Sequence, residues 1–546
     1  MRAGVPAFAG TREREGMTSP IDTFVRDRLP PLELQPEFLF ELPDLRYPEN
    51  LNAAVELIGK GDPDAIAVVN DQGAWTYGEM DDMSDRIARL LVEQEGLVAG
   101  NRVLLRGPNN ATMFAAWLGI LKAGGVVVAT MPILRPGEIA TILERAQISH
   151  AVVDSRYIGD FRQAAEQTGN VLSIVKYDGD YGEGELETRL RSVAPGFTPV
   201  ETHRDDVALI AFTSGTTGKP KGCVHFHRDV LACADSFARH VLRPEPESRW
   251  ACSAPVAFTF GLGMLLIFPW RFGGIAVTIE QPGPKPLLEA VAKFGVTHLA
   301  TAPTAYKAML GLLRDDAFDL SSLAVCVSAG EHLPAATWRA WHDATGLRLI
   351  DGIGATEMMH IFISAAGDDI RPGATGRAVP GYRACVLGDD GGPLPPPATG
   401  RLAVKGPTGC RYFDDERQRD YVQHGWNVTG DTYRQDEDGR FWYVARSDDM
   451  IISAGYNIAA PEVENALYSH PAVQECAVVG VPCEERGQKV KAFVVLAPGF
   501  TPDAAGLQDH VKAAIAPYKY PRDLEFVESL PKTGTGKLQR FALRQR

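Results

Sequence analysis

Short apolar runs alternate with amphipathic segments over the first two-thirds of the chain, and this pattern predicts an α/β fold. Residues 103–105 and 126–129 are compact runs of Val, Leu and Ala, which are typical of buried strands. Residues 111–122 and 136–146 carry apolar side chains at helical spacing, and TYGE at 76–79 has the form of a helix capping box. Strands that alternate with helices favour largely parallel sheets with helices on both faces.

The pattern changes twice in the last third of the chain. The segment DDGGPLPPPAT at 389–399 is dense in Gly and Pro, which predicts a turn and the start of a smaller β-rich section over residues 388–447. Beyond it we expect helices at 461–469 and 503–516 and strands near 476–481 and 490–496. The sequence therefore predicts a large N-terminal domain, residues 1–447, and a small α+β C-terminal domain, residues 448–546.

The composition is that of an ordinary globular protein. With 546 residues, 45% of them hydrophobic and 23% charged, the chain exceeds what one core usually supports, so we expect at least two domains. A net charge of −14 argues against a nucleic-acid-binding surface. The eight cysteines contain no C-x-x-C pair, which argues against a zinc site or a disulfide framework and favours a reducing cytoplasm.

Two segments bear on export and membrane insertion. The first 16 residues hold only a short apolar patch before a charged run, which is not the pattern of a signal peptide. The most apolar window, 116–134, is interrupted by Lys122, Gly124 and Gly125, so a helix, a turn and a strand explain it better than a membrane span. We expect a cytoplasmic protein without membrane contact.

The strongest chemical signal is the segment FTSGTTGKPKG at 212–222. Its glycines and hydroxyl residues leave backbone N–H groups accessible, and Lys219 and Lys221 add positive charge, as phosphate-binding loops require. The apolar run 207–212 predicts a buried strand ending at the loop, where open α/β sheets bind ligands. A Walker A loop is disfavoured because Pro220 stands at the position of the metal-binding hydroxyl. A flexible surface loop is the other interpretation.

Four further segments follow in order: GATE at 354–357, TGD at 429–431, RSDD at 446–449 and PKTGTGK at 531–537. Together with residues 212–222 they resemble the motifs of the adenylate-forming superfamily of acyl-CoA synthetases, adenylation domains and luciferases, and the resemblance covers residues 38–546. It implies that a carboxylate attacks the α-phosphate of ATP to give an acyl-adenylate and pyrophosphate, after which a thiol displaces AMP. Catalysis of such a transfer rests mainly on positioning and electrostatic stabilisation.

The resemblance also implies roles for individual residues. Three would be catalytic: Thr356 on the α-phosphate, Glu357 as the ligand of Mg²⁺, and Lys537 bridging the carboxylate and the α-phosphate. Asp431 would accept both ribose hydroxyls and Arg446 would reach the same ribose; taken alone, Asp431 is a turn residue. The implied ATP site comprises Thr213, Ser214, Gly215, Thr216, Thr217, Gly218, Lys221, Asp351, Asp431 and Arg446.

Asp448 corresponds to the hinge of this family. The resemblance therefore implies that the C-terminal domain rotates between the two half-reactions. Two positions depart from the family pattern, because Ile353 replaces an aromatic residue that stacks on adenine and Asn457 replaces an arginine. These departures weaken the case for adenine stacking and for one phosphate contact.

The acid substrate is indicated by DGIGATEMMHIF at 351–362, HFHRD at 225–229 and AFTFGLG at 257–263, which are similar to benzoate and 2-aminobenzoate CoA ligases. The implied aryl pocket consists of Phe258, Thr259, Phe260, Gly354, His360 and Ile361. Apolar walls suit a flat ring, although ordinary core packing is the alternative. Thr259 or His360 could accept a hydrogen bond from an ortho amino group, which favours 2-aminobenzoate over benzoate. His225 and His227 are expected at a helix start or on the surface.

The acceptor is indicated by YKYPR at 518–522, which resembles the acyl-CoA ligase version of this segment. We therefore expect ATP, Mg²⁺ and CoA as cofactors or cosubstrates and an aromatic acid as the small-molecule partner, with a homodimer left open. Three alternatives remain at this point: a freestanding enzyme that loads an aryl acid onto a separate carrier protein, a luciferase-like oxygenase, and an inactive AMP sensor.

Overall fold

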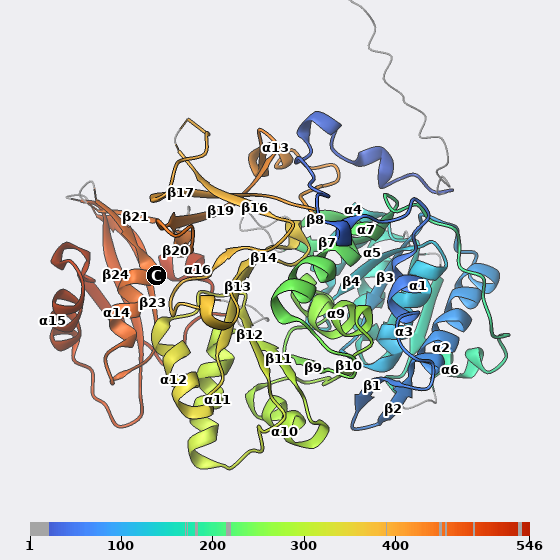
Figure 1. Ribbon diagram of the computed structural model, residues 1–546, viewed down its shortest axis with the longest axis horizontal. Coiled ribbons are helices and arrows are strands. Elements are labelled where there is room, and N and C mark those ends of the chain that lie inside the picture. The colour runs from blue at the N-terminus through green and yellow to red at the C-terminus, as the bar shows by residue number, and fades with distance from the viewer. Residues whose placement is uncertain are drawn as a thin grey trace, which may run out of the picture.

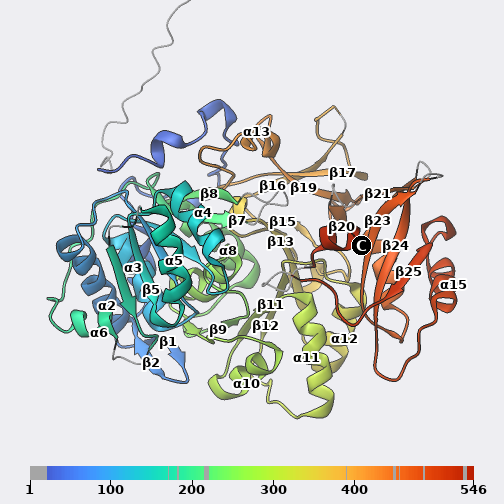
Figure 2. The same cartoon turned by 180° about the vertical axis from the view of Figure 1, so that it is seen from behind.

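The computed structural model describes residues 21–545 except 170, 172, 181–183, 214–219, 389, 447–449, 454–455, 484–485 and 533–537. In Figure 1 the two sheets of the N-terminal part occupy the centre and right, the β-rich section runs across the top, and the C-terminal elements lie at the left. Seen from behind, the C-terminal elements lie at the right and the two sheets of the N-terminal part lie at the centre and left (Figure 2). The expected α/β class, with parallel sheets and a smaller C-terminal unit, is confirmed.

The first large sheet has six strands in the order β6-β5-β3-β4-β7-β8. All neighbours are parallel except β7 and β8, which are antiparallel. The strands are β3 Arg102–Arg106, β4 Val126–Thr130, β5 His150–Asp154, β6 Ser173–Tyr177, β7 Val207–Thr213 and β8 Lys221–Phe226. Helices α2 Tyr77–Arg89, α3 Ala111–Lys122, α4 Pro136–Ala146, α5 Ile158–Thr168 and α6 Glu185–Leu190 accompany them.

Both faces of this sheet are covered, as its continuous apolar strands predict. Leu104 belongs to the core that contains α4 and α5, whereas Val103 and Leu105 belong to the core that contains α2 and α3. This alternation follows from the two-residue period of a strand. The capping box at Thr76 begins α2 as the sequence predicts.

The second large sheet has nine strands in the order β15-β14-β13-β12-β11-β9-β10-β1-β2. Its six central strands, from β13 to β1, are parallel, and the strands at both ends are antiparallel. The strands are β1 Ile66–Asn70, β2 Gly73–Thr76, β9 Arg249–Cys252, β10 Ile275–Val277, β11 His298–Thr301, β12 Val325–Ala329, β13 Leu349–Gly354, β14 Ile361–Ser364 and β15 Arg377–Ala378. The helices are α1 Ala53–Ile58, α8 Thr259–Leu262, α9 Phe268–Arg271, α10 Pro284–Phe294, α11 Pro303–Asp315 and α12 Ala335–Thr345, whereas α7 His227–Cys233 follows β8 and contacts β7 and β8 of the first sheet.

Helix α3 lies between the two sheets, and all of its residues are buried. It contacts β3 and β4 on one side, and on the other side Phe114 meets Trp270 of α9 with ring centroids 5.9 Å apart. This double burial explains why its sequence is almost as apolar as a membrane span. In the part of the chain that the structure describes, no helix combines the length and apolarity needed to cross a membrane.

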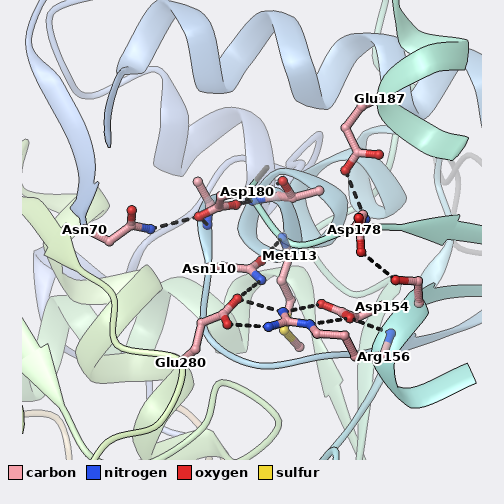
Figure 3. A network of polar contacts seen from close by, with 12 residues as sticks. Asn70, Asn110, Met113, Asp154, Arg156, Asp178, Asp180, Glu187 and Glu280 are labelled. Atoms are coloured by element: carbon pink, nitrogen blue, oxygen red, sulfur yellow. Dashed lines mark hydrogen bonds and ion pairs between the residues drawn. The ribbon is translucent and has the colours of Figure 1, made fainter. Parts of the chain in front are cut away.

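A polar network joins the two large sheets at the start of α3 (Figure 3). Arg156, which follows β5, pairs with Asp154 at 2.7 Å and with Glu280 at 2.6 Å, and Glu280 follows β10 of the other sheet. Asn110 donates to Glu280 at 2.8 Å and accepts from the backbone N–H of Met113 at 2.9 Å, so it caps α3. The network therefore fixes the start of α3 relative to both sheets.

The β-rich section is a five-stranded antiparallel sheet in the order β16-β17-β19-β18, with β20 paired to β19. Its strands are β16 Arg383–Leu387, β17 Ala398–Lys405, β18 Val422–Gln423, β19 Trp426–Gln435 and β20 Phe441–Arg446. The short helix α13 Gln418–Tyr421 lies between β17 and β18 in the sequence. The sheet starts at Arg383, five residues before the start expected from the Gly and Pro cluster, because that cluster connects β16 to β17.

The C-terminal elements form a separate five-stranded sheet in the order β22-β21-β24-β23, with β25 paired to β24. The strands are β21 Met450–Ser453, β22 Tyr456–Ala459, β23 Val473–Cys483, β24 Gly487–Leu496 and β25 Asp523–Phe526, with helices α14 Ala460–Tyr468, α15 Ala504–Ala514 and α16 Arg540–Arg544. The strands are longer than the apolar runs in the sequence because polar residues continue the pairing of β23 and β24.

A buried ion pair ties the β-rich section to the first large sheet. Arg411 Nη1 lies 2.7 Å from Asp229 Oδ2, and both side chains are fully buried. The guanidinium carbon of Arg411 lies 4.1 Å from the ring centroid of Phe38 and 4.0 Å from that of Phe226, which adds cation–π attraction. Its carbonyl oxygen accepts from the N–H of Val224 in β8 at 2.8 Å. The segment around Arg411 therefore runs beside β8.

Replacing Asp229 by Asn removes the countercharge of a buried guanidinium while keeping the side-chain shape. We expect the free energy of unfolding to fall by about 3 kcal/mol, since removing one partner leaves the other charge buried and uncompensated. Urea denaturation followed by tryptophan fluorescence measures this loss.

The matched control is Arg383→Ala, which breaks an exposed ion pair with Glu41. Surface pairs of this kind contribute less than about 1 kcal/mol. A loss for D229N that does not exceed that for R383A would contradict the assigned importance of the buried pair.

Candidate active site

The ends of the predicted phosphate loop meet at one edge of the first large sheet. Thr213 is the last residue of β7, Lys221 is the first residue of β8, and the two residues face each other in the antiparallel ladder. The loop thus begins at the carboxyl end of a strand in a parallel sheet, where such sheets bind ligands. Five residues assigned to ATP from the sequence lie outside the described residues: Ser214, Gly215, Thr216, Thr217 and Gly218.

Arg145 anchors the exit of this loop. Its guanidinium donates to the carbonyl oxygen of Pro220, and Nη2 lies 3.3 Å from Asp415 Oδ2. Asp415 in turn pairs with Arg417, beside the start of α13. The residue immediately before Lys221 is therefore held by α4 and by the segment that follows β17.

Glu357 lies next to Lys221, and Tyr412 connects them. The Tyr412 hydroxyl donates to Glu357 Oε1, while Lys221 Nζ lies 3.4 Å from the same hydroxyl oxygen and 4.9 Å from the centroid of the Tyr412 ring. Burial and the negative charge of Glu357 raise the pKa of Tyr412 far above its usual value, so the phenol stays protonated and acts as the donor. Tyr412 was missed by the sequence analysis, because a tyrosine in a connecting segment carries no signal of what it contacts.

His225 and His227 are not surface residues, and this part of the expectation is wrong. His225 lies in β8, is fully buried, and has its Nε2 2.7 Å from the carbonyl oxygen of Thr356. His227 does begin α7, but it is also buried, and its Nδ1 accepts from the N–H of Ala53 at 3.1 Å. Burial lowers the pKa of His227 to about 3. The β8 strand is covered on both faces, so its polar residues point into the interior.

Asp431 and Arg446 face each other on neighbouring strands. They are paired in the ladder between β19 and β20, and Arg446 Nη1 lies 3.3 Å from Asp431 Oδ1. Asp431 therefore lies within a strand, after Gly430 with φ of 78°, and the interpretation as a turn aspartate is not needed. The structure places the two residues assigned to the ribose beside one another.

Asp351 offers a buried acceptor near the same region. It lies in β13, and burial raises the pKa of its carboxyl well above the usual range. In the described part of the chain, its Oδ1 has no hydrogen-bond partner. Buried polar atoms are rarely left unpaired, so this oxygen is available for a hydrogen bond with a bound ligand.

The aryl-pocket residues come from two turns. Phe258, Thr259 and Phe260 lie at the start of α8, whereas Gly354 ends β13, Ile361 begins β14 and His360 immediately precedes it. The two turns meet where His360 Nε2 lies 3.3 Å from the carbonyl oxygen of Phe260. A Cβ on Gly354 would lie 2.8 Å from the backbone of His360, so only glycine allows this close approach.

His360 is held as a neutral ring in an aromatic setting. Its ring centroid lies 5.6 Å from that of Phe237, 5.6 Å from that of Phe260 and 4.6 Å from that of Phe268. Burial lowers its pKa to about 3. If Nε2 carries the proton and donates to Phe260, Nδ1 is an acceptor, and within the described residues Nδ1 has no partner.

A small cavity adjoins one side of this pocket. Phe258 and Thr259 line it together with Trp117, Ala211, Val256 and Leu262, among others, and its volume is about 10 Å³. Gly354, His360 and Ile361 do not border it. A space of this size holds no more than one water-sized body, so it does not accommodate an aromatic ring unless the side chains around it move.

The C-terminal elements contact the second large sheet through its helices and loops. Lys307 Nζ of α11 donates to the carbonyl oxygen of Gln474 at 2.6 Å, and Asn465 of α14 lies 3.4 Å from His332. Lys537 and Asp448, the residues assigned to catalysis and to the hinge, lie outside the described residues. On either side of Lys537, Lys532 and Leu538 pair in an isolated bridge.

Comparisons with known proteins identify the family of the chain. A family model described as "AMP-binding enzyme" matches residues 56–412, and one described as "AMP-binding enzyme C-terminal domain" matches residues 462–537. A benzoate–CoA ligase from Thauera aromatica is 35% identical over 515 residues, covering 92% of this chain and 97% of that relative.

Solved structures give the same result. The crystal structure of the anthranilate CoA ligase AuaEII in complex with anthranoyl-AMP is 35% identical and matches with a TM-score of 0.88, covering 92% of this chain and 98% of that chain. A benzoate CoA ligase from Burkholderia xenovorans is 32% identical, with a TM-score of 0.81 and coverage of 90% and 99%. The chain therefore belongs to the AMP-binding family of adenylate-forming enzymes.

Proposed function

We propose that this protein is an ATP-dependent aryl-CoA ligase that converts 2-aminobenzoate or benzoate to its CoA thioester through an acyl-adenylate, releasing AMP and pyrophosphate. The observation that carries the proposal is that one short segment, 354–361, contacts both the Tyr412–Lys221 group and the turn that carries Phe260. Glu357 is linked to Lys221 through the Tyr412 hydroxyl, and His360 contacts the carbonyl oxygen of Phe260. In this arrangement, an acid bound at the aromatic turn would lie close to the α-phosphate.

Each residue of the site would bind a different part of the substrates. Lys221 and the hydroxyls of the loop would hold the β- and γ-phosphates, Thr356 the α-phosphate, and Asp431 with Arg446 the ribose. Lys537 would place its charge between the carboxylate and the α-phosphate during adenylation, where negative charge accumulates on oxygen. Rotation of the C-terminal domain about Asp448 would then remove Lys537 and admit the thiol.

The donor set suits a Mg²⁺ ion that arrives with ATP. In the described residues, no cluster of three or more His, Cys, Asp or Glu side chains could hold a metal ion, so Glu357 would act as a single protein carboxylate. Mg²⁺ is commonly bound through one or two carboxylates with substrate phosphates supplying further oxygens. The ion would neutralise part of the negative charge of the phosphates.

The choice of acid depends on the polar atoms of the aryl pocket. His360 is neutral, and its Nδ1 is a buried acceptor without a partner in the described structure, which supports a substrate with an ortho donor. Thr259, also buried, is the second candidate acceptor. The relatives named as benzoate and anthranilate ligases support an aryl acid. Loading of the acid onto a separate carrier protein is the alternative for the acceptor.

The first prediction concerns the acid. We expect kcat/KM for 2-aminobenzoate to exceed that for benzoate by about tenfold, because an unsatisfied buried acceptor costs about 1–3 kcal/mol. Rates of AMP formation with CoA present, measured for both acids and for 2-hydroxybenzoate, give the comparison. In the Thr259→Val variant the preference persists if His360 is the acceptor and disappears if Thr259 is. Equal kcat/KM values in the wild type would contradict the ortho-amino hypothesis.

The second prediction concerns Lys537. We expect Lys537→Ala to lower adenylate formation by about 100-fold or more, the usual effect of removing a group that stabilises the transition state. Thioester formation from supplied aryl-adenylate and CoA should remain near the wild-type rate, because the lysine would have left the site by then. Hydroxylamine trapping measures the first half-reaction, and thioester absorbance measures the second.

Lys532→Ala is the matched control for this experiment. Lys532 lies five residues earlier and pairs with Glu475 on the surface of the C-terminal sheet. We expect its loss to leave both half-reactions within a factor of two. If K537A retained both half-reactions, or lost both equally, the assignment of Lys537 would be wrong.

A further inference from the structure

We propose that Tyr412 is a positioning residue that keeps Glu357 and Lys221 apart and presents one carboxylate oxygen to the metal ion bound with ATP. The inference rests on the proposed role of Glu357 as the metal ligand. Tyr412 contacts both groups through one atom, its hydroxyl oxygen, which donates to Glu357 Oε1 and lies 3.4 Å from Lys221 Nζ. It thereby links the phosphate loop, the turn after β13 and the segment after β17.

The backbone of Tyr412 is fixed on both sides. Its N–H donates to the side-chain oxygen of Gln418 at 2.9 Å, and it forms an isolated antiparallel bridge with Cys223 of β8. The next residue, Phe413, donates its N–H to the carbonyl oxygen of Gly222 at 3.2 Å. The preceding residue, Arg411, makes the buried ion pair with Asp229. The hydroxyl is therefore placed by the fold and not by a ligand.

The chemistry of the three groups explains why a phenol is useful there. Glu357 and Lys221 carry opposite charges, and two such groups that touch would neutralise each other instead of binding a cation and a phosphate. No ion pair joins them within the described chain, where Tyr412 lies between them. The phenol donates its one proton to the carboxylate and can accept from the ammonium group.

The contact with Tyr412 leaves one carboxylate oxygen of Glu357 available to bind a cation. Tyr412 uses Oε1, and among the described residues no hydrogen bond is made to Oε2. A carboxylate held by one oxygen has fewer orientations open to it, so less ordering is needed when the other oxygen binds a cation. Tyr412 would thus increase the affinity for the metal complex of ATP more than the affinity for metal-free ATP.

Calorimetric titration of the Tyr412→Phe variant with ATP tests this inference without relying on turnover. We expect the dissociation constant for ATP with excess Mg²⁺ to rise about tenfold, as loss of a hydrogen bond to a charged group implies. The constant for ATP in EDTA should change less than about twofold, because the phenylalanine ring still keeps Lys221 away from Glu357 and no metal ligand is then involved.

Tyr421→Phe is the matched control. The Tyr421 ring lies 5.9 Å from that of Tyr412, and its buried hydroxyl has no hydrogen-bond partner among the described residues. Its removal should leave both dissociation constants unchanged. Equal losses in Y412F and Y421F, or no loss in Y412F, would overturn the role of Tyr412. Thermal unfolding of both variants within a few degrees of the wild type establishes that each is folded.

A double-mutant cycle with Glu357→Gln separates this inference from the function on which it rests. In the E357Q background, Tyr412→Phe should cause little further loss, because the two residues act on the same metal ion. Full additivity would overturn the inference while leaving the metal role of Glu357 intact. If wild-type affinity for ATP did not depend on Mg²⁺, or E357Q did not change it, the proposed metal role would fail and the inference with it.

Discussion

The buried ion pair between Arg411 and Asp229 is the contact on which the geometry of the site depends. It joins a segment of the β-rich section to the sheet that carries the phosphate loop, across 182 positions of sequence. A charge pair with no access to water tolerates little displacement, because any separation leaves a buried charge uncompensated. The ion pair therefore also fixes the position of the neighbouring residues Cys410, Tyr412 and Phe413. Tyr412 in turn contacts Glu357 and Lys221.

The turn that carries Thr356 and Glu357 is fixed from several directions. Tyr412 holds the Glu357 side chain, His225 approaches the Thr356 carbonyl oxygen at 2.7 Å, and His360 of the same segment packs among phenylalanine rings. Thr356 and Glu357, the residues assigned to the α-phosphate and the metal ion, are therefore held by contacts within the protein, whereas the cavity beside Phe258 and Thr259 is too small for an aromatic ring. Under the proposed function, binding of the acid would move side chains around Phe258, whereas the polar contacts of Thr356 and Glu357 would stay in place. Preorganised polar groups of this kind provide most of the stabilisation in reactions that build charge on oxygen.

The sequence predicts the fold well wherever periodicity decides the structure. Helices over 111–122 and 136–146 and the capping box at Thr76 appear as expected, since apolar spacing and a local hydrogen bond define them. The sequence fails where contacts join distant segments. His225 was expected at a helix start or on the surface, because a histidine near charged residues looks exposed when the covering layers are unknown. Tyr412 could not be identified at all, since its contacts with residues 55 and 191 positions away depend on the packing of the β-rich section against β8. Motif residues such as Asp431 and Arg446 were found by resemblance, and their pairing across two strands became visible only in the structure.

The central claim is that an aromatic acid is adenylated before any thiol takes part. Exchange of labelled pyrophosphate into ATP in the absence of CoA tests this most directly, because the exchange requires reversible formation of a bound acyl-adenylate. We predict exchange that depends on added 2-aminobenzoate or benzoate and on Mg²⁺. Exchange that is absent with both acids, or that appears only when CoA is added, would contradict the account.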